Sequence, residues 1–174
     1  FPQGVLSQLY QAIAGNKPGV ITKIGLNTFV DPRIEGGRLN EATPPDYVKV
    51  IELEGEEWLL YKKINLNVCF IRGTTADING NITMEEETAF LDALAAAQAT
   101  RICGGIVIAQ VKYLADKGTL NPKFVKVPGI YVDYVVVDEE QPQTCESFYD
   151  ASLCGHVKIP TETIPPLILD YPKV

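Results

Sequence analysis

The sequence lacks the features that would place the chain in a membrane, on a nucleic acid or in the secretory route. No apolar run approaches the roughly 18–20 residues that span a bilayer, and the formal net charge is −7. This charge disfavours a nucleic-acid or anionic-membrane partner, but it leaves room for an anionic small ligand held by local Lys, Arg or backbone N–H groups. The first residues show no basic-then-apolar pattern, so we expect no signal peptide.

Cysteine and histidine are scarce as well. None of the four cysteines forms a C-x-x-C pair, and His156 is the sole histidine. Cys145, Cys154 and His156 match no standard zinc spacing and show no fourth ligand, so we expect no metal site. Cys69 and Cys103 stand in apolar or helical surroundings and are expected to be buried thiols. This cysteine usage predicts a reducing, cytoplasmic compartment.

The 174 residues that are present suit one globular domain, with 46% hydrophobic and 21% charged residues. The chain starts at Phe1 without a methionine and stops at Val174 after a proline-rich tail. A helical pattern begins almost at the first residue. We therefore expect the chain to be a piece of a longer protein.

The polar stretch from Arg72 to Asn81 follows a short apolar run, Val68–Ile71. That run predicts a fully buried strand. Thr83, with Glu86 three residues later, forms a capping-box pattern for a helix from Met84 to about Arg101. Strand, loop and helix in this order predict half of a parallel α/β unit, and open α/β sheets bind ligands at such loops.

A plainer interpretation of the same stretch is a polar turn. In that case Asn79-Gly80 supplies positive φ and Asp77 caps the turn locally. The predicted helix that follows is rich in alanine. Alanine favours helix and also suits close packing against a neighbouring element.

The other hydrophobic patterns predict one further helix and several strands. They are a helix at about 3–14, a strand at 20–24, a β-hairpin of 48–53 and 57–61, a strand at 106–111, and extended segments at 125–127 and 130–137. The segment from Gly25 to Arg38 holds three glycines and a proline, so we expect an irregular loop. Two substantial helices are few for a sheet with several buried strands, which again suggests that elements are missing.

Several motifs can be read together along the chain. They are Pro2-Gln3-Gly4, Gly25-Leu26-Asn27-Thr28-Phe29-Val30-Asp31-Pro32-Arg33 with Gly36-Gly37, Arg72-Gly73-Thr74-Thr75-Ala76-Asp77 with Gly80-Asn81-Ile82, Gly104-Gly105, Gln110-Val111-Lys112, and Val127-Pro128-Gly129-Ile130-Tyr131-Val132-Asp133. In this order and spacing they closely resemble the family I CoA-transferases, in particular the acetate/propionate CoA-transferase branch. Succinyl-CoA:3-oxoacid CoA-transferases are more distant relatives. The resemblance extends to about Val137.

The resemblance implies a fold and a domain organisation. The expected fold class is α/β, a partial three-layer α/β/α domain with a mainly parallel sheet plus a β-hairpin, of the ribose-5-phosphate isomerase/CoA-transferase type. Residues 1–137 would be the later part of the amino-terminal CoA-transferase domain. Residues 138–174 would be a loop-rich segment leading toward a carboxyl-terminal domain that is absent here.

The resemblance also implies a reaction. The parent enzyme would move coenzyme A between a short-chain acyl-CoA and a free carboxylate through a glutamyl-CoA thioester, with no prosthetic group. Its nucleophilic glutamate, in a Glu-Asn-Gly setting, would follow Val174, so this chain would hold no catalytic residue and be inactive alone. The expected partners are the acyl-CoA, the short-chain carboxylate, the remainder of the enzyme and other copies of it.

The substrate-binding residues that the resemblance implies are Gln3, Gly25, Leu26, Asn27, Thr28 and Phe29. A neutral amide at a helix start can orient a carboxylate, although Gln3 could equally be an ordinary first-turn residue. The Gly25–Phe29 segment could equally be a structural turn. For Asp31-Pro32-Arg33 and Asp77 we favour a structural role, as an ion pair or a cap. Asn27 replaces the family's usual glycine, and its side chain could narrow an acyl pocket.

Two other functions compete with this one. A non-catalytic α/β domain of the same fold that serves assembly remains an alternative, and a Glu-Asn-Gly segment further along the parent gene would argue against it. A sugar-phosphate isomerase of this fold fits poorly because no basic phosphate-binding loop is evident. Glu85, Glu86 and Glu87 lie at a predicted helix start, where carboxylates favour the helix dipole, and are poor nucleophile candidates.

Overall fold

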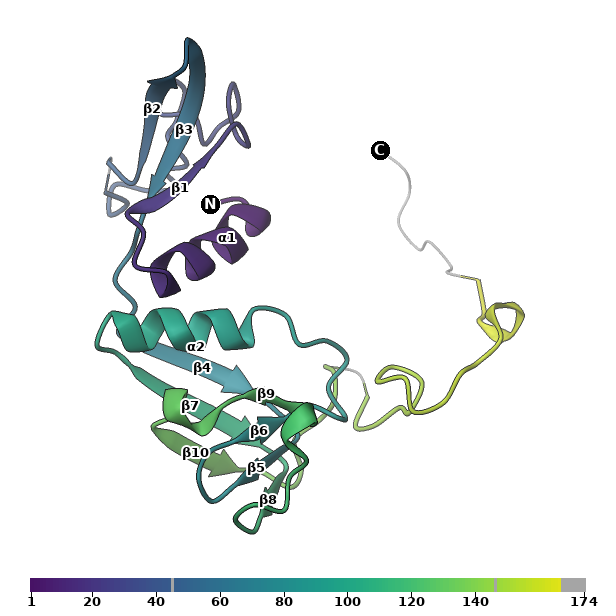
Figure 1. Cartoon of the computed structure of the whole chain (residues 1–174). Coiled ribbons are helices and arrows are strands. Elements are labelled where there is room, and N and C mark those ends of the chain that lie inside the picture. Colours follow the sequence, from purple (N-terminus) through teal and green to yellow (C-terminus); the bar gives the residue numbers. More distant parts are fainter. Residues whose placement is uncertain (45, 146, 167–174) are drawn as a thin grey trace.

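Two helices lie against each other between two sheets in the computed structural model, which describes residues 1–44, 46–145 and 147–166 (Figure 1). The upper half in Figure 1 consists of α1 (Gln3–Ala14) and an antiparallel sheet of β1 (Gly19–Thr22), β2 (Val48–Leu53) and β3 (Glu56–Lys62), in the order β1-β3-β2. None of the helices in the described residues is long and apolar enough to cross a membrane.

The lower half is a parallel sheet with a smaller mixed sheet beside it. The parallel sheet has the order β10-β7-β4, from β4 (Val68–Arg72), β7 (Ile106–Val111) and β10 (Tyr134–Val137), and α2 (Ala93–Ile102) packs on it. The mixed sheet has the order β8-β5-β6-β9, from β5 (Thr75–Asp77), β6 (Ile82–Thr83), β8 (Tyr113–Ala115) and β9 (Val125–Val127). Short 3₁₀ turns occupy Pro122–Phe124, Gly129–Tyr131 and Thr161–Thr163.

Each half has its own hydrophobic core. In the upper core, Val5, Leu9 and Ile13 of α1 pack with Leu59 and Tyr61 of β3. The lower core is centred on the inward faces of β4, β7 and the mixed sheet; its buried members are Ile71, Ala76, Ile82, Met84, Ala97, Val107, Ala109, Val111 and Val127. The mixed α/β class predicted from the sequence is confirmed.

The β-hairpin is also confirmed. Its ladder runs from Val48 opposite Tyr61 to Leu53 opposite Glu56. The two turn residues, Glu54 and Gly55, have φ values of 53° and 78°. Positive φ at both positions gives the turn a twist that matches the right-handed twist of the strands.

The predicted helix from Met84 to Arg101 is wrong in its first half. Thr83 is the last residue of β6 and pairs with Val125, and the chain reaches α2 only at Ala93. Leu91 has a φ of 44°, which interrupts any helix before that point. The capping box therefore does not form, because Thr83 pairs with a strand that is distant in the sequence and does not cap a local helix.

The strand at Val68–Ile71 exists but is not fully buried. Ile71 is 7% exposed, whereas Phe70, which points to the opposite face, is 77% exposed. Tyr134 and Val136 of β10 are exposed as well. Within the described residues α2 packs on the parallel sheet, and α1 packs on α2 and on β1, in line with the expected α/β class of a mainly parallel sheet plus a β-hairpin.

The Arg72–Asn81 stretch follows the plainer interpretation. The carboxylate of Asp77, which is 2% exposed, accepts the backbone N–H groups of Asn79 and Asn81 at 3.0 and 2.9 Å and the side-chain amide of Asn81 at 3.0 Å. Gly80 has a φ of 81°. Burial tends to raise the pKa of Asp77, but these hydrogen bonds outweigh it and hold the pKa below its ordinary value.

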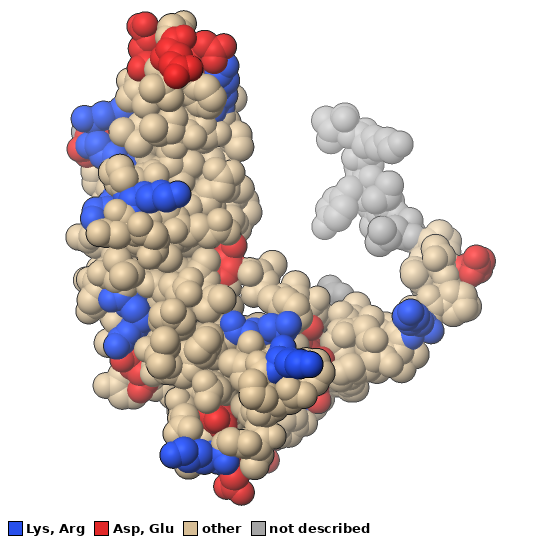
Figure 2. All heavy atoms as spheres, in the orientation of Figure 1, with Lys and Arg blue, Asp and Glu red and all other residues tan. Residues whose placement is uncertain are grey.

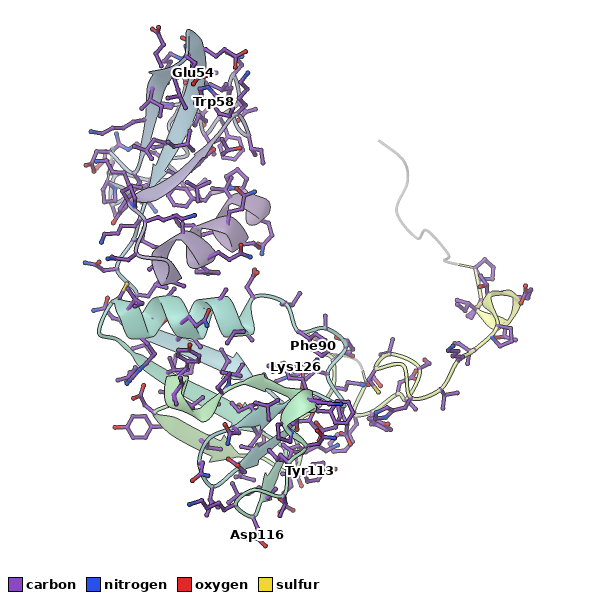
Figure 3. All side chains as sticks on the ribbon, viewed as in Figure 1. Glu54, Trp58, Phe90, Tyr113, Asp116 and Lys126 are labelled. Carbon is purple, nitrogen blue, oxygen red and sulfur yellow. The ribbon has the colours of Figure 1, made fainter. Side chains whose placement is uncertain are left out.

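We expect Asp77→Asn to destabilise the fold by roughly 1–3 kcal/mol, because the amide turns an N–H group toward donors. The lowered pKa of Asp77 means that its contribution is present above about pH 4 and is lost on further acidification. Urea unfolding at pH 7 and pH 3 measures both effects, and the gap between the two proteins should shrink at pH 3. The exposed Asp116 (Figure 3) provides the control variant Asp116→Asn. Equal stability of the two variants at pH 7 would contradict this role.

Candidate functional site

The loop between β1 and β2 contains the predicted Gly25–Phe29 segment. Gly25 has a φ of 96° and Asn27 a φ of 60°, and Gly36 and Gly37 have values of 65° and 67°. Asparagine is among the few residues with a side chain that accept this left-handed region readily. Asn27 is therefore compatible with the left-handed turn at this position.

Asp31 holds this loop together from inside. Its side chain is fully buried and accepts the backbone N–H groups of Asn27 and Arg33 at 3.0 Å each. The guanidinium of Arg33 donates to the same carboxylate from Nε at 3.0 Å and from Nη2 at 2.8 Å, and its Nη1 reaches both oxygens of Glu57 at 2.9 Å. The Arg33 hydrogen bond, opposed by burial, holds the pKa of Asp31 well below its ordinary value. The structural ion pair predicted here is confirmed.

Tyr61 of β3 fixes the start of the loop. Its hydroxyl donates to the carbonyl of Ile24 at 2.7 Å. A Cβ atom added to Gly25 would lie 2.5 Å from the Tyr61 hydroxyl and 2.4 Å from Cγ2 of Val30. Burial, followed by the nearby negative charge of Asp31, raises the pKa of Tyr61, so the hydroxyl keeps its proton. Only glycine therefore fits between β3 and the loop.

The same tyrosine lies beside the start of α1. The ring of Phe1 packs edge-on against the ring of Tyr61, with 5.3 Å between centroids. Gln3 is the first residue of α1 and is exposed, and no acidic residue or side-chain cap occupies the first turn. A helix start without such groups offers backbone N–H donors to an anion. The side chain of Tyr61 therefore contacts both Phe1, just before α1, and Ile24, just before the turn.

The remaining predicted residues divide between packing and exposure. Leu26 packs against the upper core, and the Thr28 hydroxyl donates to the carbonyl of Gly25 at 2.8 Å. Asn27 and Phe29 are exposed, Phe29 by 58%. Thr28 therefore stabilises the turn, whereas Asn27, Phe29 and Gln3 present groups that a ligand could reach.

Tyr61 is a site residue that the sequence reasoning missed. The hairpin was predicted, but its pairing with β1 was not, and only this pairing carries Tyr61 to Ile24 and Gly25. The run of Val20 to Ile24, read as a strand, gave no indication of its partner strand. The alternating pattern of β3, in which Leu59 and Tyr61 share one face, indicates only that Tyr61 is buried.

The surface charge is uneven. Figure 2 shows acidic side chains gathered at the tip of the β2–β3 hairpin, where Glu52, Glu54, Glu56 and Glu57 are exposed, while Lys and Arg are spread over the face in view.

All four cysteines are free thiols. Across residues 1–44, 46–145 and 147–166, no three His, Cys, Asp or Glu side chains come together as a metal site.

Comparison with known proteins gives consistent matches. The family described as Coenzyme A transferase matches residues 1–138. The chain is 51% identical over 176 residues to caffeate CoA-transferase of Acetobacterium woodii, covering 99% of this chain and 34% of that protein. It is 50% identical over 143 residues to acetate CoA-transferase YdiF of Escherichia coli strain K12, covering 82% of this chain and 27% of that protein. The chain thus spans about a third of these relatives.

Solved structures match as well. The thioester complex with CoA of YdiF from E. coli O157:H7 superposes with a TM-score of 0.87 at 46% identity, over 91% of this chain and 33% of that one. Glutaconate coenzyme A-transferase of Acidaminococcus fermentans has a TM-score of 0.64 at 17% identity, over 79% of this chain and 44% of that one, which is a likeness of fold alone.

Gly25→Ala tests whether β3 packs against the loop as described. We expect a loss of at least roughly 1–3 kcal/mol from the unfavourable φ, and a further loss from the collision with Tyr61 and Val30. Gly55→Ala is the matched control, because Gly55 has a φ of 78° and open space around it. Urea unfolding compares the two variants, and equal losses would show that Tyr61 does not confine the loop.

Proposed function

The chain belongs to the coenzyme A transferase family, and we propose that the protein containing it transfers coenzyme A between a short-chain acyl-CoA and a free carboxylate. The main support is the match to YdiF, which was solved as a thioester complex with CoA, at 46% identity and a TM-score of 0.87. The coenzyme A thioester would be a substrate, and no prosthetic group is required.

The nucleophile in this proposal is a glutamate outside the 174 residues. No Glu-Asn-Gly occurs in the sequence. The three consecutive glutamates are already engaged: Glu85 accepts the Thr75 hydroxyl, Glu86 pairs with Lys112, and Glu87 pairs with Arg72. A carboxylate held in this way is a weak nucleophile, because its lone pairs and charge are satisfied.

This chain would contribute substrate-binding groups. Thioester exchange needs hydrogen-bond donors where the tetrahedral oxyanion forms, and it needs water kept from the activated acyl group. Gln3 provides a side-chain amide and the first backbone N–H groups of α1, and the Gly25–Phe29 segment provides the exposed Asn27 side chain and the exposed ring of Phe29. The Asp31–Arg33 pair and Tyr61 would keep those groups in place.

Two relatives of nearly equal identity are named for different acids, caffeate and acetate. Overall similarity therefore does not identify the acyl group. We assign the choice of acyl group in part to Asn27, a central residue of the turn whose side chain is exposed. The rest of the enzyme and other copies of it would be the protein partners, and free cysteines agree with a reducing cytoplasm.

Trapping of the covalent intermediate tests the reaction. The full-length protein is incubated with propionyl-CoA, treated with borohydride, and mapped by peptide mass spectrometry. We expect one modified glutamate outside Phe1–Val174, and none when propionyl-CoA is omitted. A modified glutamate inside this range, or transfer to acetate by the 174-residue chain alone, would contradict the assignment.

Asn27→Gly in the full-length enzyme tests the acyl pocket. Glycine adopts the observed φ of 60° readily, so the turn should survive. Each methylene in a pocket changes binding by about 1–3 kcal/mol, so the efficiency ratio of butyryl-CoA to acetyl-CoA should rise at least several-fold. Kinetics with both substrates give this ratio, and Asn16→Gly, at a residue whose φ is 54° in another turn, is the control. An unchanged ratio would leave Asn27 as a turn residue only.

A further inference from the structure

The chain that follows β10 turns back across the end of the parallel sheet (Figure 1). We call residues 141–150, apart from position 146, the strap. Two of its side chains, Gln141 and Gln143, are 4% and 6% exposed, although they come from a polar segment. Buried amides are nearly always hydrogen-bonded, and their partners show what holds the strap in place.

Arg72, at the end of β4, binds the strap and the segment before α2 together. Its Nη1 donates to the carbonyl of Pro142 at 2.9 Å, and its Nη2 to the carbonyl of Gln143 at 2.6 Å. Nε and Nη2 also donate to the Glu87 carboxylate at 2.9 and 2.8 Å. Such a pattern needs the planar fork of a guanidinium, which a lysine ammonium cannot reproduce.

The two buried glutamines complete the attachment. The Gln141 amide donates to the carbonyl of Gly73 at 3.0 Å, and the Gln143 amide donates to the carbonyl of Glu86 at 2.7 Å. The amide oxygen of Gln143 accepts the backbone N–H of Asp150 at 2.7 Å, which closes the strap on itself. Each glutamine thus joins the strap to backbone that leaves β4 or precedes α2.

Lys112, just after β7, holds the far end. Its ammonium donates to Glu86 at 3.0 Å and lies 4.9 Å from the ring centre of Phe148 and 5.6 Å from that of Tyr149. The hydrogen bond with Glu86 holds the pKa of Lys112 above its ordinary value, so the cation persists. A cation over aromatic faces adds attraction without requiring a closely packed core.

Beyond the strap, the chain forms one wall of a cavity of about 560 Å³. Cys154 and His156 line that wall, and Phe90 and Lys126, which lie against each other in Figure 3, also line the cavity. The Tyr149 hydroxyl is hydrogen-bonded to Nδ1 of His156 at 2.9 Å, so the strap is connected directly to the wall. The position of the strap therefore sets whether this cavity is closed on that side.

We propose that the strap is a releasable closure, held by Arg72, Gln143 and Lys112, whose detachment opens this cavity while the rest of the fold stays intact. Phe148 and Tyr149 remain 56% and 42% exposed, so the strap is held by polar and cation–π contacts rather than by a core. Segments with few buried apolar contacts open at lower free energy than the whole domain. The proposal concerns a motion and does not depend on the transfer reaction.

The reactivity of Cys154 reports this motion. The full-length protein and its Arg72→Lys variant are labelled with iodoacetamide under native conditions, and the rate at each cysteine is followed by peptide mass spectrometry. We expect Cys154 to react roughly tenfold faster in the variant. Loss of one hydrogen bond to a charged group should make opening of the strap about tenfold more frequent. Gln143→Leu, which cannot bridge Glu86 and Asp150, should have the same effect.

Internal references distinguish strap release from general destabilisation. Cys69 of β4 is half-buried, and burial raises the pKa of its thiol, so it should stay slow in every protein. Arg38→Lys, at an exposed arginine, is the matched control for the substitution and should leave Cys154 unchanged. An unchanged Cys154 rate in both strap variants would overturn the proposal, and so would an equal acceleration of Cys69 and Cys154.

Discussion

The packing of α1 against α2 is the contact on which the rest of the structure depends. Each helix packs on a different sheet, and in the part of the chain that the structure describes the two hydrophobic cores meet where α1 contacts α2. The small side chains of α2 allow the approach: Ala99 belongs to the upper core and Ala97 to the lower one. The Ser7 hydroxyl adds a hydrogen bond of 2.7 Å to Asp92, just before α2 begins. The two halves are therefore held together by the close packing of α1 on the alanine side chains of α2, and within the described ranges they share no β-sheet.

This arrangement explains where the candidate site lies. The upper core fixes α1 and β3, β3 carries Tyr61, and Tyr61 is bonded to the chain entering the Gly25–Phe29 turn. Buried Asp31 then fixes the far side of the turn through Arg33. The exposed groups at Gln3, Asn27 and Phe29 are supported by buried contacts behind them. The N–H groups of Leu26, Asn27 and Thr28 are hydrogen-bonded within the loop, so the backbone donors open to an oxyanion are those of the first turn of α1.

Features that depend on residues close together in the sequence could be predicted. The hairpin turn at Glu54-Gly55, the ion pair of Asp31 with Arg33 and the cap at Asp77 depend on neighbouring residues, and all three were predicted. The family was recognised from ordered motifs and is confirmed.

The failures involve partners far away in the chain. Thr83 looked like a helix cap until its pairing with Val125 placed it in a strand, and the run containing Phe70 could not show that one face stays exposed. The contacts of Tyr61 and of the strap glutamines could not be predicted, because they arise only after β1 meets β3 and the chain returns over β4.

The central claim is that Gln3 and the Gly25–Phe29 turn bind the coenzyme A thioester. Hydrogen exchange of the full-length protein, with and without a non-hydrolysable acyl-CoA analogue, tests it most directly. The account predicts slower exchange of the backbone amides at Gln3-Gly4 and from Gly25 to Phe29, with no change at the exposed hairpin turn Glu54-Gly55. Unchanged exchange at both the helix start and the turn, under saturating analogue, would contradict the claim.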